Sequence, residues 1–279
     1  MTDRYGDIKK RLLEYAAKDV DIECIAAIGS STRADITADE YSDLDLFIVT
    51  KNTDSWLSGG YPARLGSVSI AFTEPTLGGG MEYRAIYDDD RDVDMIILTP
   101  VQFEACIKDG TAQWVMNRGV ELLADKSGFG SLIEQYVTRK TDPPHMSEAE
   151  FINMVNDFYF HNIWACKKLR RGELWSAKMC VDSYLKKHLL KIIELYCYNK
   201  NGTDVWHDGR FLDSWAEGFI LDELKGCFAH YDKADIKAAL DATHRLFARL
   251  GRECAQMLGF TYPESAEKCA GRYLENAEN

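Results

Sequence analysis

The segment SDLDLFIVT, residues 42–50, decides how this sequence is interpreted. Its apolar, β-branched and aromatic residues predict a β-strand over residues 44–50. Asp43 and Asp45 stand at the start of that strand, and side chains two residues apart on a strand share a face. The two carboxylates therefore converge, and they repel each other unless a cation lies between them. Mg²⁺ is the natural occupant because it prefers carboxylates together with substrate phosphates.

A D-x-D pair also occurs by chance at solvated strand edges, so its surroundings matter. Residues 22–31, IECIAAIGSS, predict a preceding strand that ends at Gly29-Ser30, with Ser30 thirteen residues before Asp43. A glycine allows the backbone to approach a phosphate, and a serine supplies a hydroxyl and an N–H group. Taken alone, Gly-Ser is an ordinary turn; beside the aspartates it is a candidate phosphate site.

A third carboxylate lies further along the chain. Residues 81–87 and 93–98 predict two strands of a hairpin around the acidic turn 88–91. Asp94 is embedded in the second of these apolar strands, so it is expected to be partly buried and to need a partner or a ligand. Asp92 has the same strand parity but lies closer to the turn, whose own aspartates are interpreted as solvated.

The remainder of the first half mixes helices with strands. The spacing of apolar residues predicts a helix over residues 7–18, and SVSIAFT predicts a strand over residues 67–73. Pro100 is a good first helical residue for a segment that ends at Gly110. Few strands with interspersed helices indicate an α+β or α/β architecture; the α+β class, with a mixed sheet flanked by helices, is the one we expect.

The second half shows helical periodicity and no strand pattern. Ser147 and Glu150 form a capping-box motif that starts a long helix closing at Gly172. The same apolar spacing recurs over residues 174–198 and 233–258, which predicts an all-α helical bundle. We place the boundary near Asp142. The expected domains are residues 1–142 and residues 143–279.

Composition and charge limit the possible functions. Of the 279 residues, 46% are apolar and 28% are charged, which permits a packed core. The 45 acids exceed the 33 bases, a net charge of −12, and this argues against a nucleic-acid binder with a basic surface. Residues 1–142 carry a net charge of −10 and the remainder −2, so the acidic excess lies with the strands. Such a balance suits a cationic or metal-bridged small substrate.

Sequence motifs for targeting, disulfides, zinc and nucleotide binding further limit the possible classes of protein. The N-terminus lacks the apolar core of a signal peptide, and no apolar run approaches the ~18 residues of a membrane helix. The eight cysteines contain no C-x-x-C pair and are expected to be reduced thiols in a cytoplasmic protein. The six histidines lack zinc-binding spacing, and no G-x-x-x-x-G-K-[ST] motif supports a P-loop.

Gly-Ser, then D-x-D on the next strand, then an acidic residue on a later apolar strand is the pattern of the nucleotidyltransferase superfamily. Together with the helical second half, the chain resembles the aminoglycoside 6-adenylyltransferases (streptomycin adenylyltransferases) over nearly all of its length. The other segments that carry the resemblance are VDMII at 93–97, VELLADK at 120–126, NDFY at 156–159, AK at 177–178 and FTYP at 260–263. The lincosamide nucleotidyltransferases share the layout but match the C-terminal half less well.

The resemblance implies Mg²⁺-dependent transfer of AMP from ATP to a hydroxyl of a cationic aminoglycoside. A streptomycin-like acceptor modified at O-6 is expected, with release of pyrophosphate. Asp43, Asp45 and Asp94 would form the metal site in an N-terminal nucleotidyltransferase domain. Asp94 would also be catalytic by accepting the proton of the attacking hydroxyl, although the sequence does not separate that role from metal binding.

The resemblance also implies contacts with the nucleotide and the acceptor. The expected nucleotide-binding residues are Gly29, Ser30, Arg33, Lys167 and Arg210. The family commonly has Arg directly after Gly-Ser, whereas this chain has Ser31, so Arg33 is the candidate for the same phosphate. Lys167 also fits as a cation that complements the dipole at the end of its helix. Asp182 is either a helix-surface acid or a carboxylate that binds the cationic acceptor.

Two alternative functions fit the same sequence pattern. The same chemistry on another acceptor, such as a lincosamide, fits the motifs, and so does a non-catalytic nucleotide-binding protein of the same fold. We expect a monomer or a homodimer that acts on small molecules, without nucleic-acid or membrane partners.

Overall fold

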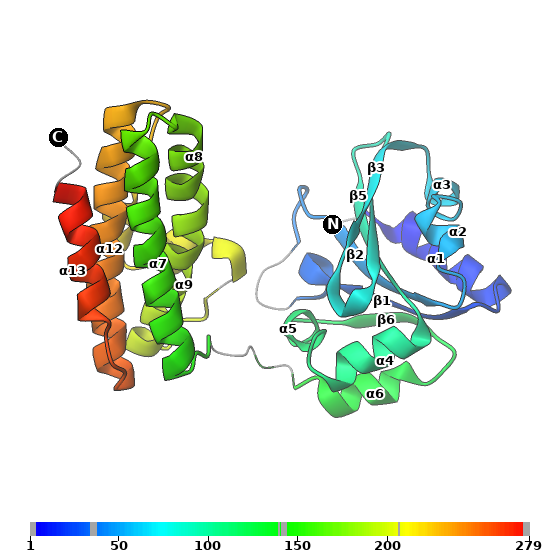
Figure 1. Ribbon diagram of the computed structural model, residues 1–279. Coiled ribbons are helices and arrows are strands. Elements are labelled where there is room, and N and C mark those ends of the chain that lie inside the picture. The colour runs from blue at the N-terminus through cyan, green and yellow to red at the C-terminus, as the bar shows by residue number, and fades with distance from the viewer. Residues whose placement is uncertain (1–3, 34–37, 139, 141–143, 206, 276–279) are drawn as a thin grey trace. The chain divides into compact units, whose positions relative to one another are not determined.

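The structure is a computed structural model that describes residues 4–33, 38–138, 140, 144–205 and 207–275 (Figure 1). The chain divides into two compact units, Met1–Thr141 and Asp142–Asn279. The first unit contains two hydrophobic cores and the second unit contains one.

The first unit is built on a six-stranded mixed sheet with the strand order β3-β4-β5-β2-β1-β6. The strands are β1 (Ile22–Ile28), β2 (Leu44–Thr50), β3 (Val68–Pro75), β4 (Met81–Tyr87), β5 (Asp92–Leu98) and β6 (Glu121–Asp125). The two central strands, β2 and β5, pair in parallel, and the other neighbouring pairs are antiparallel. Strands β1, β2 and β5 are buried almost throughout, as their continuous apolar runs predict for the centre of a sheet.

Helices cover both faces of this sheet. They are α1 (Gly6–Lys18), α2 (Asp54–Leu57), α3 (Pro62–Leu65), α4 (Pro100–Lys108), α5 (Gln113–Met116) and α6 (Phe129–Tyr136), with short 3₁₀ turns η1 (Gly29–Thr32) and η2 (Leu77–Gly79). On β2, Leu44, Leu46 and Ile48 join the core formed with α1, α2 and α3. Phe47 and Val49 join the core formed with α4, α5 and α6. The alternation along β2 therefore fills two cores at once.

Every regular element described between Glu148 and Glu275 is helical. The helices are α7 (Glu148–Arg170), α8 (Leu174–Met179), α9 (Leu185–Asn201), α10 (Leu212–Trp215), α11 (Gly218–Leu224), α12 (Lys233–Leu258) and α13 (Glu264–Glu275), with a π-helical turn η3 (Cys180–Tyr184) and a 3₁₀ turn η4 (His207–Gly209). Four of them, α7, α9, α12 and α13, are long and lie alongside one another (Figure 1). Their shared core contains a stacked pair of rings, Phe158 and Phe247, with centroids 3.6 Å apart.

Helix ends follow their sequence signals. The Ser147 hydroxyl accepts from the Glu150 N–H and the Glu150 carboxylate accepts from the Ser147 N–H, which is the expected capping box. Thr99 and Gln102 form a second capping box in front of Pro100. The helix expected over residues 233–258 has those bounds. Residues 174–198 are helical, as expected, and one turn within them, η3, has π-helical instead of α-helical geometry.

None of the described helices is long and apolar enough to span a membrane. All eight cysteines are free, and seven of them are buried.

Candidate active site

Three carboxylates meet where the two parallel strands begin. Asp45 on β2 lies directly beside Asp94 on β5 in the register, and Asp43 immediately precedes β2. One carboxylate oxygen of each residue lies within 4.8 Å of the other two. Asp45 and Asp94 share the parity of the residues that pack under α4, so both point to the same face of the sheet. The structure thus brings together the three aspartates that the sequence singled out.

Asp94 is the most buried of the three, with 2% of its surface exposed. Its Oδ2 forms an ion pair with Nη2 of Arg84 on β4. Its Oδ1 is buried and has no hydrogen-bond partner among the described residues. Because an unpaired buried carboxylate oxygen is costly, this atom points to a ligand that the protein itself does not supply.

Arg84 is a component of the site that sequence reasoning missed. It lies directly opposite Asp94 in the β4–β5 register, and it also contacts Oε1 of Glu74 at 3.2 Å. The hydrogen bond to Asp94 raises the pKa of Arg84 above its usual range. The expected hairpin brings Arg84 near this part of β5, but an even pairing across residues 88–91 would place it opposite Met95; the observed register places it opposite Asp94.

The surrounding acids add to the negative charge. Burial raises the pKa of Glu82, and the charge of Asp94 raises it further. Burial also raises the pKa of Asp92, with additional contributions from Asp94 and Asp43. One arginine facing this many carboxylates leaves an excess of negative charge, which a divalent cation would balance.

Gly29-Ser30 lies beside the carboxylates. Strand β1 ends at Ile28, the register partner of Asp45, and Gly29 follows with a φ of +72°. A Cβ at this position would lie 1.9 Å from Oδ2 of Asp45, so a larger residue would displace that carboxylate. The hydroxyl of Ser30 is buried and has no hydrogen-bond partner among the described residues.

The residues that follow Ser30 shape the same turn. The Ser31 hydroxyl donates to the carbonyl of Ile28 at 3.3 Å, so this side chain stabilises the turn. Arg33 ends the turn in an extended conformation and is partly buried. A contact between Arg33 and a phosphate stays a prediction.

The donor set fits Mg²⁺. Hard carboxylate oxygens are the ligands that this ion prefers, and it usually binds through one or two of them together with substrate phosphates. Asp94 Oδ1 is an unpaired oxygen within such a set, and the Ser30 hydroxyl is an unpaired polar group beside it. The three carboxylates would hold the ion on the protein side, which leaves its other positions for substrate oxygens.

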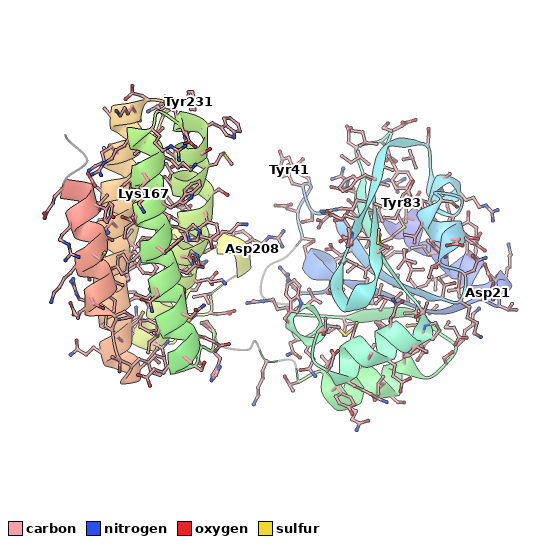
Figure 2. The ribbon with its side chains drawn as sticks, in the orientation of Figure 1. Asp21, Tyr41, Tyr83, Lys167, Asp208 and Tyr231 are labelled. Atoms are coloured by element: carbon pink, nitrogen blue, oxygen red, sulfur yellow. The ribbon has the colours of Figure 1, made fainter. Side chains whose placement is uncertain are left out.

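The remaining expected nucleotide contacts lie in the second unit. Lys167 is exposed on α7, and its Nζ lies 5.4 Å from the ring centroid of Tyr273 on α13 (Figure 2). Arg210 is exposed between η4 and α10, and its carbonyl accepts from Nε1 of Trp215 at 2.8 Å. The contacts of both residues with ATP remain predictions.

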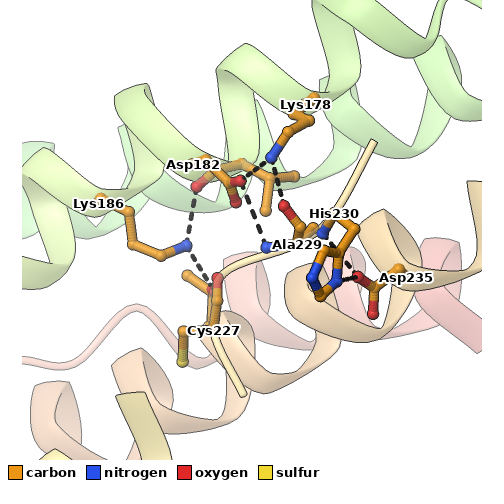
Figure 3. A network of polar contacts seen from close by, with 9 residues as sticks. Lys178, Asp182, Lys186, Cys227, Ala229, His230 and Asp235 are labelled. Carbon is orange, nitrogen blue, oxygen red and sulfur yellow. Dashed lines mark hydrogen bonds and ion pairs between the residues drawn. The ribbon is translucent and has the colours of Figure 1, made fainter. Parts of the chain in front are cut away.

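Asp182 has well-defined partners within the second unit. It lies in the π-helical turn η3, where its Oδ2 is ion-paired with Lys178 and accepts from the N–H of Ala229 at 3.3 Å (Figure 3). Its Oδ1 is buried without a hydrogen-bond partner among the described residues. These contacts join η3 to the segment before α12, so Asp182 has a structural role in addition to the acceptor-binding role predicted for it.

Lys186 adjoins the same network. Its Nζ donates to the carbonyl of Val181 at 2.9 Å and to the hydroxyl of Thr243 at 2.8 Å. Burial lowers the pKa of Lys186 to about 8, because the charged ammonium loses hydration that two neutral acceptors do not replace.

This lowered pKa predicts how stability depends on pH. Between the folded-state pKa of about 8 and the unfolded value of 10.5, the unfolded chain binds the additional proton. Stability from this group therefore rises as pH increases through that window. Relative to the Lys186→Met variant, the parent protein should gain up to ~3 kcal/mol between about pH 7 and about pH 10. Urea denaturation of both proteins at the two pH values tests this, and a constant difference would contradict it.

The sheet and its three carboxylates indicate a nucleotidyltransferase. Comparisons with known proteins agree with this class. Residues 4–277 match the family described as "Streptomycin adenylyltransferase", and the chain belongs to this family of enzymes. The resemblance inferred from the sequence is thereby confirmed.

Individual relatives cover nearly the whole chain. Over 266 residues the chain is 21% identical to "Aminoglycoside 6-adenylyltransferase" of Bacillus subtilis (strain 168), covering 91% of each protein. Over 272 residues it is 23% identical to "Aminoglycoside 6-adenylyltransferase" of Campylobacter jejuni, covering 92% of this chain and 90% of the relative. Among solved structures, it is similar to an aminoglycoside 6-adenyltransferase from Bacillus subtilis with a TM-score of 0.48 and 16% identity, covering 98% of this chain and 96% of that one.

Proposed function

We propose that the protein transfers AMP from ATP to a hydroxyl of an aminoglycoside, with Mg²⁺ bound by Asp43, Asp45 and Asp94. The observation that carries this proposal is the convergence of three carboxylates, one of which keeps a buried oxygen without a partner. Membership of the streptomycin adenylyltransferase family supports a streptomycin-like acceptor. The names of the two relatives support position 6 of the acceptor as the site of modification.

The chain's own groups have separable tasks in this reaction. Gly29 presents backbone without a side chain, so the triphosphate of ATP can approach β1, and the Ser30 hydroxyl donates to a phosphate oxygen. Asp43 and Asp45, together with Asp94, would hold the metal ion. When bound, Mg²⁺ neutralises charge on the phosphate oxygens and on the leaving group.

Asp94 acts on the acceptor as well as on the metal. The acceptor oxygen attacks the α-phosphorus, a new oxygen–phosphorus bond forms, and the bond to the β-phosphate oxygen breaks as pyrophosphate leaves. The proton of the attacking hydroxyl passes to Asp94, whose free oxygen Oδ1 is the available acceptor. Arg84 holds Oδ2 of the same carboxylate and so fixes its orientation.

We assign metal binding and the phosphate contacts of Gly29 and Ser30 to the first unit, and acceptor binding and two further nucleotide contacts to the second, helical unit. Lys167 and Arg210 contact the triphosphate in this proposal, and Asp182 lies near the cationic acceptor. The net charge of −10 in residues 1–142 favours the approach of a polycation. Eight free cysteines suit a reducing compartment, so we place the enzyme in the cytoplasm, as a monomer or homodimer.

Pyrophosphate release tests the proposal. The protein is incubated with ATP, Mg²⁺ and, separately, streptomycin, other aminoglycosides and a lincosamide, and Asp45→Asn serves as the inactive control. We expect release with streptomycin that requires both Mg²⁺ and Asp45. Pyrophosphate release with the lincosamide and with no aminoglycoside would support AMP transfer but identify a lincosamide as the acceptor. Binding of ATP and Mg²⁺ without turnover on any acceptor would contradict the enzyme assignment.

A further inference from the structure

The second unit contains a pocket between α7 and α9, with a volume of about 490 Å³. Chain preceding α7 (Pro144, His145 and Met146) borders it, and the two helices supply the other walls. We propose that this α7–α9 pocket binds a cationic nitrogen group of a sugar-like ligand, with Glu194 as the carboxylate that pairs with it. The inference rests on the proposed function, because the ligand we assign is the aminoglycoside acceptor.

The charge of the pocket favours a cation. Glu150, Asp157 and Glu194 contribute three carboxylates to its lining, and Lys191 contributes the single full positive charge. When Glu194 is ionised, these four groups give the lining a formal net charge of −2. A nucleotide or another phosphate-bearing ligand would be repelled.

Two of the three carboxylates already have partners. Glu150 accepts from the backbone and the hydroxyl of Ser147 at 2.8 and 2.7 Å in the capping box. Asp157 accepts from the Tyr184 hydroxyl at 3.0 Å, and it lies 2.6 Å from Nδ1 of His161. Neither needs a ligand to satisfy it.

Glu194 differs from both. Within the described part of the chain it has no hydrogen bond and no ion pair, although it lines the pocket and is partly buried. Burial raises the pKa of Glu194 and the charge of Asp208 on η4 adds to the rise, while Lys191 offsets part of it, so the pKa is about 7 (Asp208 is labelled in Figure 2). A partly buried carboxylate without a partner lowers the free energy of unfolding, and a bound cation would restore it.

The rest of the lining identifies the kind of cation. Asn153, His145 and Nδ1 of His188 offer polar atoms suited to hydroxyl groups, since Nε2 of His188 already faces Asp157 at 3.3 Å. Met154 and Leu195 offer apolar surface. A bare metal ion fits poorly, because among the described residues only the Asp43, Asp45 and Asp94 group has the spacing of a metal site. Hydroxyls, apolar ring faces and a charged nitrogen occur together in an amino sugar, and the volume suits a small-molecule ligand.

Isothermal titration calorimetry on the full chain tests this inference. Streptomycin is the main probe, spermidine is a polycation without sugar rings, and ATP with Mg²⁺ reports on the carboxylates of the first unit. We expect Glu194→Gln to weaken streptomycin binding at least ~10-fold, the loss typical of a hydrogen bond to a charged group, and to leave ATP binding unchanged. Glu253→Gln makes the same charge change on α12, at a carboxylate paired with Arg249, and should alter streptomycin binding less than about twofold.

Thermal unfolding supplies a second readout that a merely structural role would not produce. At about pH 8, without ligand, Glu194→Gln should raise Tm, because it removes a buried charge, while the affinity for streptomycin falls. A variant that binds streptomycin as tightly as the parent protein overturns the inference.

The outcomes also separate this inference from the proposed function. Glu194→Gln could release pyrophosphate in the presence of streptomycin with an unchanged KM for streptomycin. That result would support the transferase function and reject acceptor binding in the α7–α9 pocket. The protein could bind spermidine but not streptomycin, with spermidine binding abolished by Glu194→Gln. That result would support a cation-binding pocket and reject an aminoglycoside as its ligand. Failure of both probes to bind the parent protein would overturn the pocket.

Discussion

Gly29→Ala should reduce kcat/KM at least ~100-fold, because the added Cβ would overlap with Oδ2 of Asp45. The added Cβ would lie 1.9 Å from this oxygen, so the carboxylate of Asp45 must move by about an ångström or more. Displacements of this size in a catalytic group have large effects on rate, and a shifted Asp45 also weakens its hold on the metal ion. Steady-state kinetics and a Mg²⁺ titration measure the two consequences.

A second glycine provides a matched control for the backbone. Gly259 ends α12 with a φ of +71°, almost the same as Gly29, but a Cβ there meets nothing within 4 Å. Alanine therefore carries a similar backbone strain of about 1–2 kcal/mol at either position. We expect Gly259→Ala to lose some stability and to keep its activity. Equal activity in the two variants would show that crowding against Asp45 does not matter for catalysis.

Asp94→Asn should lower kcat at least ~10²-fold, the lower range for loss of a general base. The amide keeps the shape of the side chain and the contact with Arg84 through its oxygen, but it cannot accept the hydroxyl proton. Steady-state kinetics gives kcat, and a Mg²⁺ titration tells whether metal binding changes with it. A fall in kcat with unchanged Mg²⁺ affinity assigns Asp94 as base, whereas a parallel fall in both assigns it as ligand as well.

Asp92→Asn is the matched comparison for that experiment. Asp92 lies two residues earlier on the same strand, so it has the same parity, but it is not one of the three clustered carboxylates. Its removal should change kcat by only a few-fold. Near-normal turnover in Asp94→Asn would remove Asp94 from the mechanism.

Much of the fold could be predicted because its central strands are buried on both faces. Strands β1, β2 and β5 are short apolar runs bounded by turn residues, and such runs carry a strong signal. Strand β6 was missed because it is short and carries acids at both ends, so it lacks a clear apolar pattern. Helices α10 and α11 are also short, and periodicity says little over four to seven residues.

The candidate site was predictable where it depends on local strand geometry. Parity placed Asp43 and Asp45 on one face, and an acid within an apolar strand drew attention to Asp94. Arg84 and Glu194 required knowledge of packing. In the sequence, Arg84 does not differ from the other arginines, and only the pairing of β4 with β5 places it against Asp94. Glu194 is an ordinary glutamate in a helical pattern, and only the packing of α7 and α9 places it in a pocket.

The parallel pairing of β2 and β5 has a consequence for how this protein can change over time. Asp45 and Asp94 are neighbours through the main-chain ladder, although 48 residues separate them in sequence. Insertions in the surface connections between those strands leave that ladder intact, whereas deleting one residue inside β5 would turn its carboxylate to the opposite side. Natural variation in length should therefore accumulate in the connections, and loops exchanged between distant relatives should leave the chemistry in place.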